Sequence, residues 1–202
     1  MTEFYLIRHG RTDMVGKVLC GRTPGIRLNA DGQRQAQELA GRLMHLEIDH
    51  IFSSPLERAL ETAAPLAAQM GLTVHLAEEL TEFDAGEWVG RTFAELEQMS
   101  GWMQFNRFRS GKRIPGGESM REVQDRMVAL VEKLSGDYPG GRIAIVSHAD
   151  PIKALLGYYG GIPLDLLLRI EISTASLSVL LLDEWNSRIV CINNTNEVLF
   201  PR

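Results

Sequence analysis

The sequence predicts an α/β fold, a three-layer α/β/α sandwich around a mostly parallel central sheet. Short apolar runs that stop at polar residues alternate with amphipathic stretches, in the order β-α-β-α, an irregular stretch, then α-β-α-β-β. The length of 202 residues and the hydrophobic content of 45% suit one large domain. We therefore expect a single domain over residues 1–202, with a small cap insertion at residues 77–117.

The strands are predicted from apolar runs that are bounded by turn residues. They are expected at residues 4–7, 48–52, 73–76, 142–146, 177–182 and 188–192. The last two strands read as a closing β-hairpin around Asp183–Ser187. This hairpin offers an edge that two copies of the chain could share, so a homodimer is left open.

The helices are predicted from apolar residues at helical spacing, with start and stop signals at their ends. A serine or asparagine can cap the first N–H groups of a helix, and proline is tolerated at the first helical position. The expected starts are Asn29, Ser54 before Pro55, Glu118, and an N-capping Asp150 before Pro151. The expected ends are Gly71, Gly136 and the Gly157–Gly161 stretch. Residues 14–29 show no period and predict a long loop.

Composition argues against several classes of partner and location. The formal net charge of −5 does not favour nucleic acid, and the longest apolar run is too short to cross a membrane. Acidic Glu3 stands where a secretory signal would be basic, and Cys20 and Cys191 fit no metal spacing. We therefore expect a cytoplasmic protein that binds neither nucleic acid nor membrane.

Polar residues follow three of the predicted strands at the point where each strand ends. The first strand leads into Arg8, His9 and Gly10, the second into Ser53 and Ser54, with Arg58 on the next helix, and the fourth into Ser147 and His148. Ligands of open parallel sheets bind beyond the carboxyl ends of the strands. Two arginines beside two histidines repel a cation and suit a tetrahedral oxyanion. The pattern predicts a phosphate site and no metal.

Five segments together resemble the histidine phosphatase superfamily, which includes cofactor-dependent phosphoglycerate mutases, broad-specificity phosphatases and α-ribazole phosphatases. The segments are LIRHGRTDMVGKVLCGRTPGIRLNADGQRQA (6–36), FSSPLERALETAAPLA (52–67), TEFDAGEWVGRT (81–92), PGGESMREVQDR (115–126) and IAIVSHADPIKALL (143–156). They cover most of the chain and occur in the family's order. The resemblance implies a phosphoglycerate mutase-like fold.

The resemblance also implies a role for each matching residue. His9 is the expected nucleophile, Arg8, Arg58 and His148 the expected ligands of the phosphoryl oxygens, and Glu82 the expected proton donor. Thr12, Arg22 and Ser53 are further candidates for phosphate contact. No cofactor is expected. The chain departs from the family at Asp150, where many members have glycine.

The function implied by the resemblance is hydrolysis of a small phosphorylated metabolite, a phosphomonoester, through a phosphohistidine on His9. Two alternatives stay open: phosphoryl transfer of the phosphoglycerate mutase type, and a catalytically silent phosphate-binding module. The short stretch after the last predicted strand favours hydrolysis, because mutases of this family carry a longer tail. Aromatic residues of the 77–117 segment are expected to form its core or an apolar wall, and its basic residues to attract a second anion.

Overall fold

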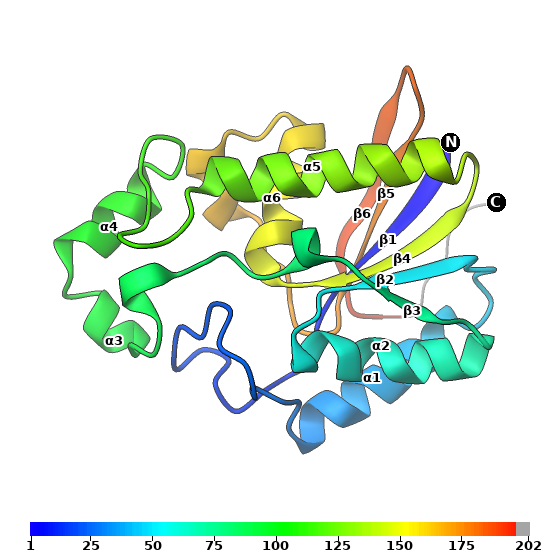
Figure 1. The fold of residues 1–202 in the computed structure, drawn as a ribbon, viewed down its shortest axis with the longest axis horizontal. Coiled ribbons are helices and arrows are strands. Elements are labelled where there is room, and N and C mark those ends of the chain that lie inside the picture. The colour runs from blue at the N-terminus through cyan, green and yellow to red at the C-terminus, as the bar shows by residue number, and fades with distance from the viewer. Residues whose placement is uncertain (197–202) are drawn as a thin grey trace.

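A six-stranded sheet in the order β3-β2-β4-β1-β5-β6 forms the centre of the computed structural model, which describes residues 1–196 (Figure 1). Its strands are β1 (Thr2–Arg8), β2 (His50–Ser53), β3 (Val74–Leu76), β4 (Arg142–Ser147), β5 (Leu177–Leu182) and β6 (Ser187–Asn194). The first four strands are mutually parallel, and β5 and β6 join as the predicted antiparallel hairpin. The predicted fold class is confirmed.

Helices cover both faces of this sheet. The α-helices are α1 (Ala30–Leu43), α2 (Glu57–Met70), α3 (Phe93–Leu96), α4 (Ser100–Arg107), α5 (Met120–Asp137) and α6 (Ala149–Gly160). Figure 1 shows α1 and α2 on one face and α5 and α6 on the other. No helix within residues 1–196 combines the length and the apolar character needed to cross a bilayer.

The two faces of β1 bury different side chains because successive residues of a strand point to opposite sides. Phe4 and Leu6 join the apolar cluster of α5 and α6, whereas Tyr5 and Ile7 join that of α1 and α2. A strand that is buried on both faces reads as a continuous apolar run. This is the pattern from which the first strand was predicted.

Three of the predicted helix boundaries are confirmed by their capping groups. The Asn29 side chain accepts the Gly32 N–H at 2.9 Å and caps α1. Gly71 and Gly161 follow α2 and α6 with φ angles of +67° and +66°. Glycine reaches this left-handed region without the steric cost that a Cβ brings. The α5 helix begins at Met120, where Ser119 is the N-cap of a capping box with Glu122, and runs one residue past Gly136.

Two predicted starts are wrong. Ser54 does not cap α2, which begins at Glu57, because the Ser54 N–H still bonds the carbonyl of Val146 in the sheet at 2.9 Å. Asp150 does not cap α6 either. His148 is the N-cap residue, and its carbonyl accepts the Ile152 N–H at 3.2 Å. Asp150 is therefore the second residue of the helix.

The segment between β3 and α5 holds the 3₁₀ turns η1 (Glu78–Leu80) and η2 (Gly86–Trp88), followed by α3 and α4. Figure 1 shows α3 and α4 beside one end of the sheet. Trp88 packs edge-on against Trp102 and Phe105, each at 5.5 Å between ring centroids. Trp88 and Phe105 share the apolar cluster of α5 and α6. The segment thus has an aromatic core, and its role as a cap stays a prediction.

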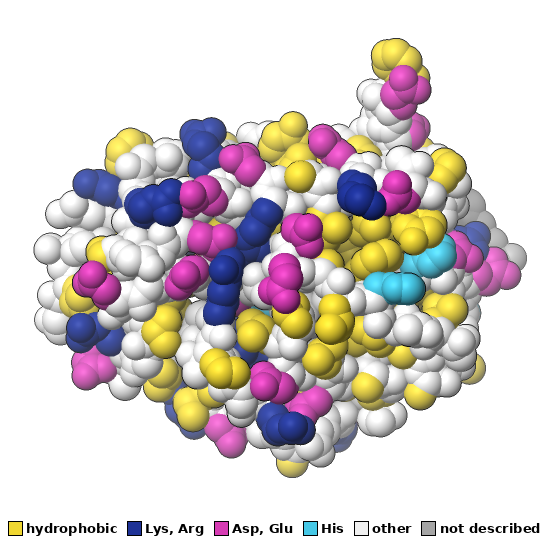
Figure 2. Space-filling model, viewed as in Figure 1, with side chains coloured by type: hydrophobic (Ala, Val, Ile, Leu, Met, Phe, Trp, Pro, Cys, Tyr) yellow, Lys and Arg dark blue, Asp and Glu magenta, His cyan; other side chains and the backbone are white. Residues whose placement is uncertain are grey.

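Charges of both signs are mixed on the face shown in Figure 2, where basic side chains lie beside acidic ones. The contact between the long loop at residues 14–29 and the start of α5 follows this pattern. Glu118 accepts from Arg22 at 2.8 Å and from Arg126 at 3.2 Å. These arginines therefore both pair with the same carboxylate.

Candidate active site

The ends of β1, β4 and β2 lie side by side, as the sequence predicted. Arg8 is in register with Ser147, and Ser53 with Val146. The His9 N–H continues the ladder beyond β1 by donating to the Ser147 carbonyl at 3.0 Å. Because the strands are parallel, the residues that follow them meet at one edge of the sheet.

His9 is buried, with 5% of its surface exposed. Its Nδ1 lies 2.7 Å from the carbonyl oxygen of Gly10. A carbonyl can only accept, so the proton of the neutral ring is assigned to Nδ1, which leaves a lone pair on Nε2. Burial, and then the charges of Arg58 and Arg8, hold the pKa of His9 well below its ordinary value. The ring is therefore neutral, as a nucleophile must be.

The loop after His9 is held by a threonine that the sequence analysis did not single out. The Gly10 N–H donates to Thr62 Oγ1 at 2.9 Å, and the Thr62 hydroxyl donates to the Arg58 carbonyl at 2.6 Å. A Cβ on Gly10 would lie 2.7 Å from the backbone oxygen of Gly32, so only glycine allows this close approach. The spacing of four residues between Arg58 and Thr62 places both on one helix face.

Arg8 and Arg58 are tethered at one nitrogen each. Arg8 Nη1 donates to the Ile172 carbonyl at 2.6 Å, and Arg58 Nη2 to the Gly21 carbonyl at 2.8 Å. The Nε of Arg8 and the Nη1 of Arg58 are buried without a hydrogen-bond partner. Burial lowers the pKa of both guanidinium groups. Buried, unpaired donors are costly, and an anion that accepts from them removes that cost.

His148 lies edge-on to His9, with 5.1 Å between ring centroids. Its Nε2 lies 2.9 Å from the Ser54 hydroxyl, while its Nδ1 is buried without a partner. Burial, followed by the charge of Arg58, lowers the pKa of His148 well below its ordinary value. The Ser54 contact was not predicted, because the Ser-Pro pair was interpreted as a helix start.

Glu82, from the 77–117 segment, lines a cavity at the strand ends together with His9 and the two arginines. Its Oε1 accepts the Phe83 N–H at 3.0 Å. Burial and then the charge of Asp150 raise the pKa of Glu82 to about 7, against the opposing effects of the Phe83 bond, Arg58 and Arg8. A carboxyl with this pKa exists in both protonation states near neutral pH, which suits a general acid and base.

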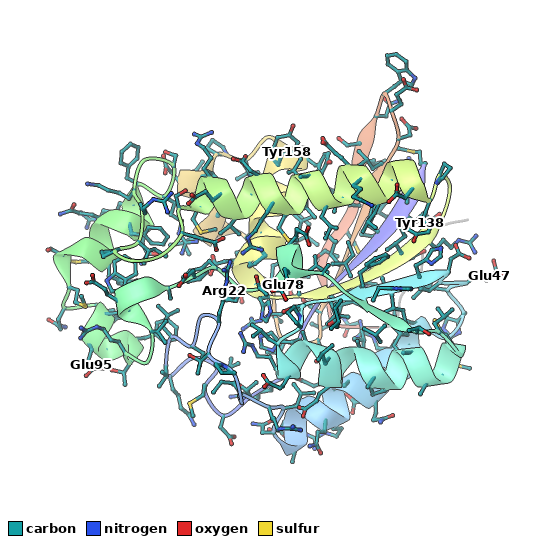
Figure 3. All side chains as sticks on the ribbon, viewed as in Figure 1. Arg22, Glu47, Glu78, Glu95, Tyr138 and Tyr158 are labelled. Atoms are coloured by element: carbon teal, nitrogen blue, oxygen red, sulfur yellow. The ribbon has the colours of Figure 1, made fainter. Side chains whose placement is uncertain are left out.

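Of the three further candidates for phosphate contact, Thr12 lines the cavity, whereas Ser53 and Arg22 do not. Thr12 is buried and lines the cavity. Ser53 is buried elsewhere and donates to the Ser54 carbonyl at 2.9 Å. Arg22 also lies outside the cavity lining, because its Nε donates to the Glu82 carbonyl at 2.9 Å and its Nη2 to Glu118. Figure 3 shows Arg22 between the segment that carries α3 and α4 and the sheet.

The cavity at the strand ends measures about 140 Å³. Arg8, His9, Arg58, Glu82 and Asp150 contribute its ionisable groups apart from Cys20, and the long loop and the 77–117 segment supply most of the rest. Within residues 1–196, no group of three or more His, Cys, Asp or Glu side chains could hold a metal ion. The lining donors Arg8 and Arg58 suit an anion, whereas His148 is not among the lining residues, and the phosphate site stays a prediction.

The family model of the histidine phosphatase superfamily, branch 1, matches residues 4–195. The chain is 33% identical over 181 residues to the "Probable phosphoglycerate mutase GpmB" of Salmonella choleraesuis, a match that covers 88% of this chain and 84% of the relative. The chain belongs to the histidine phosphatase superfamily. It is also 35% identical over 186 residues to a bifunctional protein of Mycobacterium tuberculosis. That match covers 88% of this chain and 50% of the relative, so the chain spans about half of that protein's length.

Solved structures of two phosphatases share this fold over nearly the whole chain. A phosphoserine phosphatase of Entamoeba histolytica superposes with a TM-score of 0.88 at 28% identity, covering 98% of this chain and 100% of that one. The α-ribazole phosphatase of Shigella flexneri superposes with a TM-score of 0.85 at 26% identity, with the same two coverages of 98% and 100%. The phosphoglycerate mutase-like fold that the sequence predicted is confirmed.

Proposed function

We propose that this histidine phosphatase hydrolyses a small phosphomonoester through a phosphohistidine on His9. The observation that carries the proposal is the bond between His9 Nδ1 and the Gly10 carbonyl. It supports a free lone pair on Nε2 beside the unpaired donors Arg8 Nε and Arg58 Nη1. A nucleophile and its anion-binding groups are thus held together before any substrate arrives.

In the first step, His9 Nε2 forms a bond to phosphorus while the bond from phosphorus to the leaving oxygen breaks. The Nδ1 proton stays on the ring, where the Gly10 carbonyl stabilises the positive charge that develops. Arg8, Arg58 and His148 offer donors to the phosphoryl oxygens, the electrostatic role that dominates phosphoryl transfer. Protonated Glu82 gives its proton to the leaving alkoxide.

In the second step, water attacks phosphorus and the bond to His9 Nε2 breaks. Glu82, now a carboxylate, accepts a proton from that water. Phosphate leaves, and both Glu82 and the neutral His9 are restored. The raised pKa of Glu82, about 7, lets one group act as acid and then as base with little cost in either direction.

A phosphoglycerate mutase is the second candidate, and the similarity to the Salmonella protein favours it. A mutase returns the phosphoryl group to an acceptor hydroxyl, so its phosphohistidine must outlast the exchange of substrate and product. The catalytically silent module is the third candidate. It predicts phosphate binding without turnover. The cytoplasmic location, the lack of a metal or cofactor requirement, and the homodimer stay predictions.

The test is release of phosphate from a panel of phosphomonoesters in EDTA, with His9→Ala alongside. We expect turnover by the wild type and none by His9→Ala, because the variant has no nucleophile. Equal hydrolysis by both proteins would overturn the proposal. Absence of release from every ester, together with isomerisation of 3-phosphoglycerate, would establish the mutase, and binding without either reaction would establish the silent module.

A further inference from the structure

A buried ion pair joins the 77–117 segment to the start of α6, immediately beside the cavity. Arg109 Nη1 lies 2.5 Å from Asp150 Oδ1, and the Arg109 side chain is only 3% exposed. Its Nη2 donates to Asn106 at 2.9 Å, and its guanidinium lies 5.1 Å from the centre of the Phe105 ring. Arg109 is therefore held from several sides and turned away from solvent.

Asp150 pairs with Arg109 and also lines the cavity. Although burial disfavours its charged form, Arg109 and Lys153 hold the pKa of Asp150 below the ordinary value. The carboxylate is therefore ionised. A buried guanidinium without a counter-ion would be costly, and Asp150 supplies that counter-ion, so Arg109 has no free charge to offer an anionic substrate group.

The remainder of the cavity lining has no other cation to offer such a group. In the described part of the chain, Arg8 and Arg58 are the only basic side chains of the lining, and both lie beside His9. Beyond them the wall includes a set of apolar side chains, namely Met14, Val15, Val18, Leu19, Phe83 and Phe93. The other basic residues of the 77–117 segment that the sequence pointed to, such as Arg107 and Lys112, are exposed and lie outside the lining.

We propose that Asp150, by neutralising Arg109 directly behind the cavity lining, restricts this site to phosphomonoesters with an uncharged, largely apolar leaving group. The inference rests on the proposed function and narrows its substrate class. A leaving group that carries a carboxylate finds no free cation, because Asp150 already matches the charge of Arg109, and it loses solvation against the apolar wall. A leaving group that carries an ammonium gains little, because the Asp150 charge is already matched by Arg109, and it loses solvation against the apolar wall.

Three esters that differ only at one end test this selectivity. Butyl phosphate, 3-aminopropyl phosphate and 4-(phosphonooxy)butanoate share a three-carbon spacer and end in methyl, ammonium and carboxylate. We expect kcat/KM to be highest for butyl phosphate. For 4-(phosphonooxy)butanoate it should be lower by about tenfold or more, a difference of about 1.4 kcal/mol. Higher activity on the carboxylate or the ammonium ester would overturn the inference while leaving the proposed phosphatase intact.

The variant Asp150→Asn tests whether the charge of Asp150 causes this selectivity. Asparagine can still accept a hydrogen bond from Arg109 but removes the negative charge. The ratio of kcat/KM for butyl phosphate to that for 4-(phosphonooxy)butanoate should therefore fall about tenfold. Any general change in Glu82 cancels in this ratio, since all three esters meet the same protein. Asp137→Asn, an exposed carboxylate near the opposite end of the strands, is the matched control and should keep the wild-type ratio.

A ratio that is unchanged in Asp150→Asn would contradict the role of Asp150. The wild-type ranking needs no variant, so the proposed substrate class is tested even if Asp150→Asn does not fold. Wild-type protein that releases no phosphate from any of the three esters, or from the wider panel, would overturn the proposed function and this inference with it.

Discussion

The two ends of the cavity are built in opposite ways. At the inner end, Arg8 ends a strand that is buried on both faces and His9 follows it, and backbone carbonyls tether the His9 ring and the guanidinium groups of Arg8 and Arg58. At the outer end, loops and the first residues of α3 and α6 supply apolar side chains and the acidic residues Glu82 and Asp150. The inner end is therefore positive and rigidly supported, and the outer end is apolar and acidic.

This difference separates the chemistry from the choice of substrate. Groups that bind a phosphoryl group must hold their geometry closely, and sheet ends supply that support. Groups at the outer end lie mostly on loops, which tolerate change in sequence better than the scaffold that carries them. Changes at the inner end should therefore reduce turnover of every ester, whereas changes at the outer end should depend on the leaving group.

Glu82→Gln should have the largest effect among the variants that keep His9. Glutamine cannot donate a proton to the leaving oxygen, so kcat/KM for alkyl phosphates should fall by roughly 100- to 10,000-fold. The loss should be much smaller for p-nitrophenyl phosphate, whose leaving group is stable without a proton. Glu78→Gln, an exposed neighbour labelled in Figure 3, should retain full activity. An equal loss on both kinds of ester would contradict the acid role.

Arg58→Met should lower kcat/KM for all esters by roughly 100- to 1,000-fold, independently of the leaving group, because it removes a donor aimed at the phosphoryl oxygens. Steady-state kinetics on the butyl, carboxylate and p-nitrophenyl esters measure this uniformity. The exposed pair Arg27–Glu61 offers Arg27→Met as a control, which should show no loss. A loss confined to one ester would place Arg58 at the outer end instead.

Phe93→Ala should have a smaller effect that grows with the size of the leaving group. The side chain lines the cavity and packs near Trp102, so its removal should lower kcat/KM for butyl phosphate about tenfold through lost apolar contact. Methyl phosphate, which does not reach the outer wall, should be hydrolysed nearly as fast as by the wild type. Phe108→Ala, at an exposed position, is the control.

The pH dependence should be set by Glu82, because His9 is neutral throughout. The Glu82 pKa is raised to about 7, so the acid is present below that pH and lost above it. We expect kcat/KM for alkyl phosphates to fall as pH rises through about 7. Asp150→Asn should move this decline to lower pH, because the Asp150 charge is one cause of the raised pKa. A decline that is unmoved in Asp150→Asn would show that Asp150 does not act on Glu82.

The inner end could be predicted from sequence because local patterns determine it. Arg8 and His9 follow an apolar run, and a parallel sheet brings such strand ends together. The helix start predicted from Ser54 and Pro55 was wrong, because the Ser54 N–H is still bonded to the neighbouring strand in the sheet. Glu82 lies in an acidic stretch where only the family resemblance distinguished it.

The outer end could not be predicted in the same way. The 77–117 segment carries several basic residues, and no local pattern shows that Arg109 is the one turned inward onto Asp150. That contact joins positions 41 residues apart and depends on how α4 packs. The Ile172 carbonyl that tethers Arg8 is equally hidden, since every residue has a carbonyl.

The most direct test of the proposed phosphatase activity is to trap the phosphohistidine that it requires. Wild-type protein is mixed with p-nitrophenyl phosphate in EDTA, quenched in alkali, where phosphohistidine survives, and digested for mass spectrometry. We expect one added phosphoryl group on the peptide that contains His9, and none in His9→Ala. A phosphoryl group on another residue, or turnover by wild type with no phosphorylated protein at any time, would contradict the role of His9.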